Sequence, residues 1–180
     1  FVCCLGVTFP APCFGVAADI RRRLPAQMAA LEPALEGFTV LACAGSHALL
    51  SLAVVAYPRI DLWADSIEAL LALPIPDQGP LLLACTDDLP DGSVLELIMQ
   101  LRRTLAGRPL LVITKLDAST DPLRLKALAE EGVQGLCCSH AVGNGQLLSA
   151  LSAVLHGGSF VDAGFAAQLR QPSHSGSRFG

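Results

Sequence analysis

The sequence predicts an α/β domain built on a parallel sheet with helices on both faces. From residue 38 onward, short apolar runs alternate with amphipathic segments, giving five strand–helix units. The third apolar run, "PLLLAC", is nearly continuous, which is typical of a central parallel strand buried on both sides. Hydrophobic residues make up 52% of the 180 residues and charged residues only 16%, so the chain is expected to fold around a sizeable core.

The first strand is predicted at residues 38–44, "FTVLACA", with Gly45 and Ser46 as the turn that follows. A helix in "HALLSLAVVAY" comes next, and "RIDLWA" at residues 59–64 is a shorter second strand. The remaining strands are expected at residues 80–85, 109–114 and 133–138, and the fifth helix lies in "GQLLSALSAVLHGG".

Capping residues predict where the helices between these strands begin. Each proposed start has a side chain able to accept a backbone N–H, followed by a residue suited to the first turn. The predicted pairs are Asp65 with Glu68, Ser93 with Glu96, and Asp121 with Pro122.

The chain divides into an N-terminal extension at residues 1–36, a domain at residues 37–157, and a linker with a flexible tail at residues 158–180. The extension is expected to be partly helical or disordered, with its helical segment broken by Pro25 and Pro33. Its apolar beginning has no preceding basic segment and is interrupted by prolines, so no membrane anchor is expected.

Charge and cysteine content exclude two broad classes of protein. The net charge of −4 argues against a broad phosphate-binding surface. Seven cysteines at irregular spacing, several of them inside apolar strands, indicate reduced and buried thiols, not a secreted disulfide framework. We therefore expect a cytoplasmic protein.

The functional edge of such a sheet is formed by the carboxyl ends of its strands. The polar or glycine residues expected there are Gly45 to His47, Thr86, Asp87 and Asp88, Thr114 and Lys115, and Ser139 and His140.

Three segments carry a family resemblance: "DLPDGSVLELIMQLR", "PLLVIT" followed by "ALAEEGVQG", and "LLSALSAVLHGGSFVDAGFAAQLR". In this order they resemble the receiver domain of two-component response regulators, in the branch that precedes a LuxR-type helix-turn-helix. The resemblance covers residues 38–170. It implies a flavodoxin-like (βα)5 three-layer sandwich, with a five-stranded parallel sheet in the order 2-1-3-4-5.

Receivers hold Mg²⁺ between two acidic residues after strand one and a phosphoacceptor aspartate after strand three. A lysine after strand five binds the phosphoryl group, and a Thr or Ser after strand four responds to it. Counting four residues back from Pro90 places Thr86 at the phosphoacceptor position. The acidic pair falls within residues 44–46, where no residue is acidic, and the lysine position is Ser139. Thr114 keeps the expected type at the switch position.

The resemblance thus implies a degenerate receiver without standard phosphotransfer, catalysis, metal or cofactor. It would signal through a homodimer or a protein partner, with a sensor kinase as a possible partner and DNA reached only through a helix-turn-helix that this sequence does not include. One alternative is a functional receiver with Asp87 as acceptor, Asp88 assisting and Mg²⁺ bound. Lys115 would then be a candidate replacement cation.

Other interpretations remain open. Asp87 and Asp88 are also favoured before a Pro-Asp-Gly turn, without any chemistry. The cysteines and histidines near the sheet edge lack metal-ligand spacing. The turns "GSH" and "GNG" would suit a small nucleotide-binding protein or enzyme, although they lack the G-x-G-x-x-G order.

Overall fold

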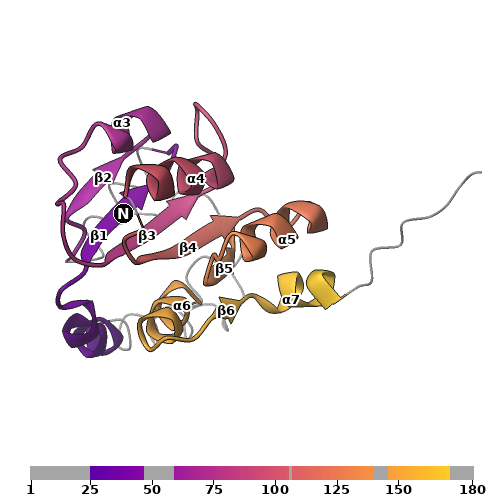
Figure 1. The fold of residues 1–180 in the computed structure, drawn as a ribbon. Coiled ribbons are helices and arrows are strands. Elements are labelled where there is room, and N and C mark those ends of the chain that lie inside the picture. Colours follow the sequence, from indigo (N-terminus) through magenta and orange to yellow (C-terminus); the bar gives the residue numbers. More distant parts are fainter. Residues whose placement is uncertain (1–24, 47–58, 106, 140–145, 171–180) are drawn as a thin grey trace, which may run out of the picture.

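A computed structural model describes residues 25–46, 59–105, 107–139 and 146–170 and contains one parallel sheet (Figure 1). The strand order is β2-β1-β3-β4-β5-β6. The strands are β1 (Thr39–Cys43), β2 (Leu62–Ala64), β3 (Leu81–Thr86), β4 (Leu110–Leu116), β5 (Gly135–Cys138) and β6 (Phe160–Val161). The predicted order 2-1-3-4-5 is confirmed, and a short sixth strand extends the sheet beyond β5.

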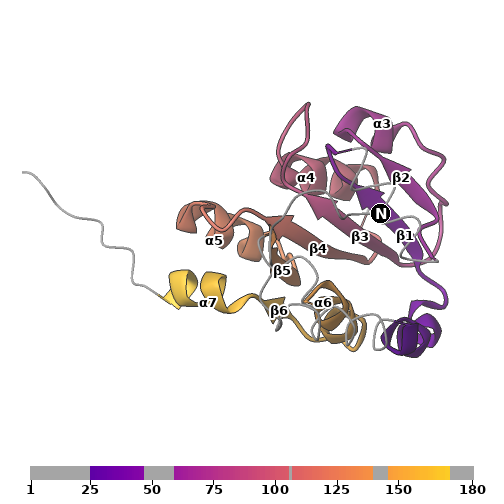
Figure 2. The same ribbon diagram turned by 180° about the vertical axis from the view of Figure 1, so that it is seen from behind.

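Helices cover both faces of the sheet, as the three-layer prediction requires (Figures 1 and 2). They are a helix over residues 25–35, α3 (Ile67–Leu71), α4 (Val94–Thr104), α5 (Pro122–Glu130), α6 (Gln146–Leu155) and α7 (Ala163–Arg170). The helix predicted in "HALLSLAVVAY" and the "GNG" turn lie outside the described residues.

Alternate side chains of the central strands enter two separate cores. Leu81, Leu83 and Cys85 pack into the core shared with α3, α4 and α5, whereas Leu82 packs toward α6 and the helix over residues 25–35. Both faces of β3 are therefore buried, which explains why its sequence is a continuous apolar run.

β2 and β5 start three and two residues later than the sequence pattern predicts, and the same hydrogen-bond arrangement occurs at both. The backbone N–H of Asp61 donates to the carbonyl of Val40, while its carboxylate accepts the N–H of Val40 at 2.7 Å. Gln134 repeats this arrangement with Val112, whose N–H donates to Gln134 Oε1 at 2.7 Å. A polar side chain takes the place of a ladder carbonyl at each site, so β2 begins at Leu62 and β5 begins one residue after Gln134.

Two of the three predicted helix caps are confirmed. Ser93 and Glu96 form the expected reciprocal capping box of α4. Asp121 caps α5, with Pro at its first turn. The cap of α3 is Ser66, whose hydroxyl accepts the N–H of Ala69, so the prediction of Asp65 is wrong by one residue.

The flanking segments belong to the folded domain more than the sequence suggests. The helix over residues 25–35 continues through Pro33, and Leu31 and Leu35 are buried on the α6 face. Pro33 lies in the last turn, where its missing N–H costs a single hydrogen bond and does not break the helix.

The residues expected to form a linker after position 157 instead add β6 to the sheet edge. Phe160 and Val161 pair with Gly135 and Leu136 of β5. In α7, Phe165 is fully buried in the core that includes α5. Edge strands expose unpaired backbone groups, so β6 protects the edge of β5.

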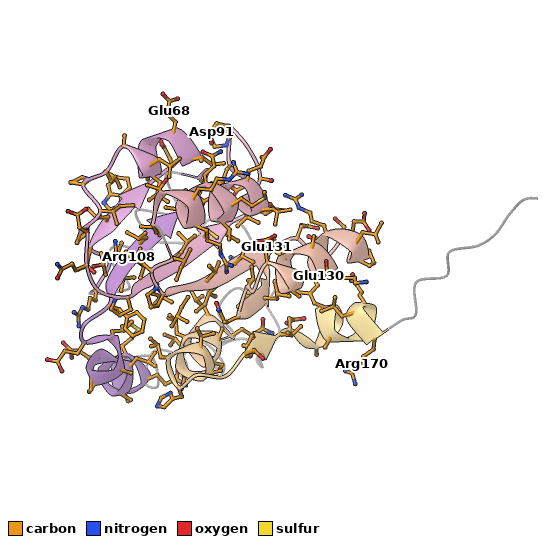
Figure 3. All side chains as sticks on the ribbon, viewed as in Figure 1. Glu68, Asp91, Arg108, Glu130, Glu131 and Arg170 are labelled. Atoms are coloured by element: carbon orange, nitrogen blue, oxygen red, sulfur yellow. The ribbon has the colours of Figure 1, made fainter. Side chains whose placement is uncertain are left out.

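Arg108 holds a loop at the edge of the sheet where the amino ends of the strands lie. Its guanidinium donates to the carbonyls of Pro76, Gln78 and Gly79, with Nη2 at 2.9 Å from Gln78 and 2.7 Å from Gly79. Figure 3 places Arg108 far from Asp91, which lies beside α3 at the carboxyl edge. The loop before β3 is thus held by a structural arginine.

No helix in the described ranges is long and apolar enough to cross a membrane.

Candidate functional site at the carboxyl edge of the sheet

The strand register places most of the predicted site residues at one edge of the sheet. In the strand register, Cys43 of β1 lies opposite Cys85 of β3, and Cys85 lies opposite Thr114 of β4. The next row pairs Thr86 with Lys115, which in turn pairs with Cys137. The sequence pattern predicted Thr114 as the last residue of this strand and Lys115 just after it. In the structure β4 continues to Leu116, so both residues lie within the strand.

The segment after β1 is packed directly against the loop after β3. A Cβ atom at position 45 would lie 1.7 Å from the carbonyl oxygen of Asp88 and 3.4 Å from the Cα of Leu89. Glycine is thus the residue that this contact admits. The space beside Gly45 is filled by the backbone of the loop after β3.

Thr86 occupies the predicted phosphoacceptor position at the end of β3 and is partly buried. Its hydroxyl donates to Oδ1 of Asp88, whose residue is exposed to solvent. The two side chains therefore satisfy each other within the loop. Asp88 thus lies beside Thr86, and the partner of its carboxylate there is a neutral hydroxyl group.

Asp87 points toward the helices on the α4 and α5 side. Its Oδ1 lies 2.5 Å from Nη2 of Arg124 and accepts the N–H of Val94 at 3.5 Å. The Asp87 side chain is 15% exposed and that of Arg124 is 38% exposed. Burial raises the pKa of the Asp87 carboxyl above its ordinary value, and the Arg124 charge offsets only part of this effect.

Arg124 is the site residue that the sequence analysis missed. A basic side chain in the first turn of a helix is opposed by the helix dipole, which favours negative charge there. Arg124 lies in the first turn of α5, directly after Pro122 and Leu123. This misplaced charge was the available sequence signal that an anionic partner was needed, although the partner, 37 residues away, was not evident.

Thr114 lies in the core with its side chain on the same face as Cys85 and Leu116. The residue is completely buried. Its hydroxyl makes no hydrogen bond of ordinary geometry to the described residues and lies near the Cys85 thiol, whose pKa is raised by burial. Thr114, predicted at the switch position, is therefore an interior residue in this structure.

Lys115 and Ser139 are the two residues considered above for the cationic side of the predicted phosphoryl site. Strand alternation directs Lys115 to the opposite face from Thr114, toward the side occupied by Ile113 and α6. Ser139 follows β5 and is partly buried, with no charge to contribute. The cation that does reach Asp87 comes from α5.

Asp91 has a structural role that its turn sequence did not reveal. Its two carboxylate oxygens accept the N–H groups of Ile67 and Glu68, each at 2.9 Å. Figure 3 shows Asp91 beside Glu68 at the start of α3. These hydrogen bonds lower the pKa of the Asp91 carboxyl, and the one from Glu68 has the larger effect. The β3–α4 loop is thereby fastened to α3.

The described cysteines are free thiols. Cys43, Cys85 and Cys137 are buried, and burial raises the pKa of Cys43 and of Cys137 to about 12. Within the described residues, no three His, Cys, Asp or Glu side chains are grouped to hold a metal ion. The predicted edge residues His47 and His140 lie outside the described residues.

Comparison with known proteins places the fold. No protein-family profile and no curated protein sequence matches the chain. Among solved structures, the response regulator RcsB of Salmonella typhimurium superimposes with a TM-score of 0.63 at 18% identity, covering 75% of this chain and 70% of that one.

Two further solved structures, each matched over nearly its whole length, have the same fold. The isolated receiver domain of RcsB from Salmonella enterica gives a TM-score of 0.57 at 17% identity, covering 73% of this chain and 97% of that one. A LuxR-family response regulator from an Aurantimonas species gives 0.57 at 14% identity, covering 73% and 94%. The chain therefore has the fold of the receiver domain found in LuxR-family response regulators.

Proposed function

We propose that this chain is a receiver-like signalling domain that does not accept a phosphoryl group and acts through protein–protein contact. The contact between Gly45 and the backbone of Asp88 carries the proposal. In a phosphorylatable receiver, this space would have to admit acidic side chains that hold Mg²⁺. Here an added Cβ atom already meets backbone, and backbone moves far less readily than the end of a side chain.

The remaining chemistry of the edge points the same way. Phosphoryl transfer depends on electrostatic stabilisation of charge that develops on the transferring group. Thr86 offers a hydroxyl where an aspartate is needed, and Ser139 offers no positive charge. The residues that would bind Mg²⁺ and the phosphoryl group are therefore replaced or enclosed, while the scaffold around them is retained.

The likeness to LuxR-family regulators supports a role in transcription regulation. A solved structure shows RcsB dimers bound to DNA. By analogy, this domain would form a homodimer or bind a partner protein, and it would reach DNA through a LuxR-type helix-turn-helix on the same polypeptide. It would respond to a protein contact, with a sensor kinase as one candidate, and would work in the cytoplasm without enzymatic activity.

A second candidate function keeps phosphorylation and uses Asp87 as acceptor. The favouring observation is Arg124, which places a positive charge 2.5 Å from the Asp87 carboxylate. A guanidinium can stabilise a phosphoryl group through parallel hydrogen bonds. In this candidate, Mg²⁺ would bind with help from Asp88, even though residues 44–46 supply no carboxylate.

Intact-mass measurement after incubation with acetyl phosphate and Mg²⁺ distinguishes the two functions. We expect no mass increase of about 80 Da, the mass of one phosphoryl group added to a side chain. The isolated RcsB receiver domain, treated in parallel, serves as the positive control. An adduct that forms on the wild-type chain and disappears in Asp87→Asn would establish the second function and refute the first.

The nucleotide-binding alternative receives a separate test. A thermal-shift screen with adenine and guanine nucleotides is expected to leave the melting temperature unchanged, because a ligand that binds the folded state must raise it. A concentration-dependent rise for one nucleotide would favour a binding protein or enzyme instead.

A further inference from the structure

Helix α5 is held at its first turn by the loop that follows β3. Arg124 joins Asp87 there, and the same Asp87 oxygen accepts the N–H of Val94 at the start of α4. A residue next to the predicted phosphoacceptor position thus connects two helices. A change in the partners of Asp87 would therefore act directly on the first turn of α5.

Helix α5 is held a second time, by the C-terminal helix α7. Leu125 and Leu128 of α5 share one buried core with Phe165 of α7, and all three are fully or almost fully buried. Gln168 Nε2 also donates to the carbonyl of Ala118, in the loop that leads into α5, at 3.5 Å. Figures 1 and 2 both place α7 at the α5 end of the sheet.

The docking of α7 has the features of a reversible contact. The helix has eight residues, and Phe165 is its one buried residue. Isolated helices of this length are marginal in water, so α7 depends on its packing. Gln168 Oε1 is buried without a partner among the described residues, which weakens the docked state.

We propose that α5 couples the Asp87–Arg124 pair to the docking of α7, so that the pair holds the C-terminal helix on the domain. Breaking the pair would loosen the first turn of α5 and the Ala118 loop together, and α7 would leave the α5 surface. The carboxyl edge of the sheet would thus control, through an ion pair, whether α7 stays docked on the domain.

This coupling extends the signalling role proposed above and rests on it for its biological meaning. Its physical test is independent of phosphorylation, because the readout is the opening of α7. A domain that accepts phosphoryl groups could still show the coupling, and a domain that accepts none could lack it. The two proposals can therefore fail separately.

Amide hydrogen exchange of α7 in the whole chain measures the coupling. Arg124→Met should speed exchange at residues 163–170 by about fivefold or more, the lower end of typical coupling energies, while amides of β1 and β3 stay as protected as in the wild type. Phe165→Ala, which removes the docking contact directly, shows how fast α7 exchanges when undocked. Lys126→Met is the matched control, because it removes the exposed Lys126–Glu130 pair from the same helix.

Unchanged exchange of α7 in Arg124→Met, alongside fast exchange in Phe165→Ala, would overturn the proposal. If Arg124→Met loosens the whole sheet, Arg124→Lys decides the question, because it keeps a positive charge beside Asp87 and leaves the Val94 N–H its acceptor. Protection of α7 in Arg124→Lys between the levels of the wild type and Arg124→Met supports the coupling. Exchange of α7 as fast as in Arg124→Met, with a protected sheet, contradicts it.

Discussion

Asp87 and Asp91, in the first and second halves of the β3–α4 loop, have carboxylates in opposite environments. Asp87, in the first half, is largely buried and ion-paired, and desolvation raises its pKa. Asp91, four residues later, lies at the surface, and two backbone N–H groups lower its pKa. The Asp87 carboxylate is enclosed by the domain, whereas the Asp91 carboxylate holds the loop to α3. Aspartate in a loop of this kind does not by itself indicate chemistry.

The enclosure of the first half is the feature with the largest expected effect on stability. Gly45→Asp would restore an acidic side chain at a receiver position, but its Cβ atom would lie 1.7 Å from the Asp88 carbonyl. We expect the free energy of unfolding to fall by about 3 kcal/mol or more, as for severe overpacking. Urea denaturation measures this change.

Gly107→Ala is the control for that experiment. Gly107 has a φ of 84° and nothing within 4 Å of an added Cβ, so its substitution isolates backbone strain, with an expected cost of about 1 kcal/mol. A Gly45→Asp protein as stable as the wild type would show that the loop moves aside without cost. The enclosed-site interpretation would then be wrong.

The ion pair of the first half should have a smaller effect. Arg124→Met leaves the Asp87 carboxylate buried without its charged partner. Because both side chains are partly exposed and solvent screens the pair, we expect a loss of about 1 kcal/mol. Lys126→Met, which removes a surface i,i+4 pair, should cost only about 0.3 kcal/mol in the same urea series. Equal losses in the two variants would mean that Asp87 gains nothing specific from Arg124.

The fastening role of the second half can be tested with Asp91→Asn. An amide oxygen still accepts one of the N–H groups of Ile67 and Glu68, but it brings no negative charge to the start of α3. We expect a lower melting temperature than the wild type, with a decrease smaller than in Arg124→Met. Hydrogen exchange should rise first in α3. Unchanged exchange at residues 67–71 would show that Ser66 caps the helix sufficiently alone.

Carboxyl titration followed by NMR compares the two halves directly. The Asp87 midpoint should lie above the reference value of about 3.9 and the Asp91 midpoint below it. Arg124→Met should raise the Asp87 midpoint further, because the arginine lowers it in the wild type. A downward shift of Asp87 in that variant would contradict the assigned pair.

The two groups should also contribute to stability with opposite dependence on pH. Asp91 binds protons less readily when folded, so its stabilisation is present above about pH 3.9 and is lost as the pH falls through its folded pKa. Asp87 binds protons more readily when folded. Its contribution therefore becomes less favourable as the pH rises from about 3.9 to its folded pKa, and then stays constant.

Much of the fold was predictable because its signals are local. The capping box of Ser93 and Glu96 and the cap at Asp121 depend on contacts within one helical turn, and both are confirmed. The shift of the α3 cap from Asp65 to Ser66 was not predictable from spacing. Asp91 binds the first N–H groups of that helix from another part of the chain, which changes what the local cap has to satisfy.

The end of the domain was harder to predict for a related reason. The family resemblance implied that the sequence after residue 157 is a linker leading to an output domain. Pairing of Phe160 and Val161 with β5, and burial of Phe165 against α5, stabilise a strand and a helix that would not persist alone.

The sequence by itself determined the alternation of strands and helices, the order in which the family resemblance places them, and the absence of acidic residues at positions 44–46. The alternation follows from periodicities of two and 3.6 residues, and the missing acidic residues follow from residue identity. The strand order was an expectation that the family resemblance supplied. Only the tertiary structure decided that Gly45 meets the Asp88 backbone and that Arg124 binds Asp87. Both contacts join segments far apart in the chain, and such distances exist only once the sheet has brought those segments together.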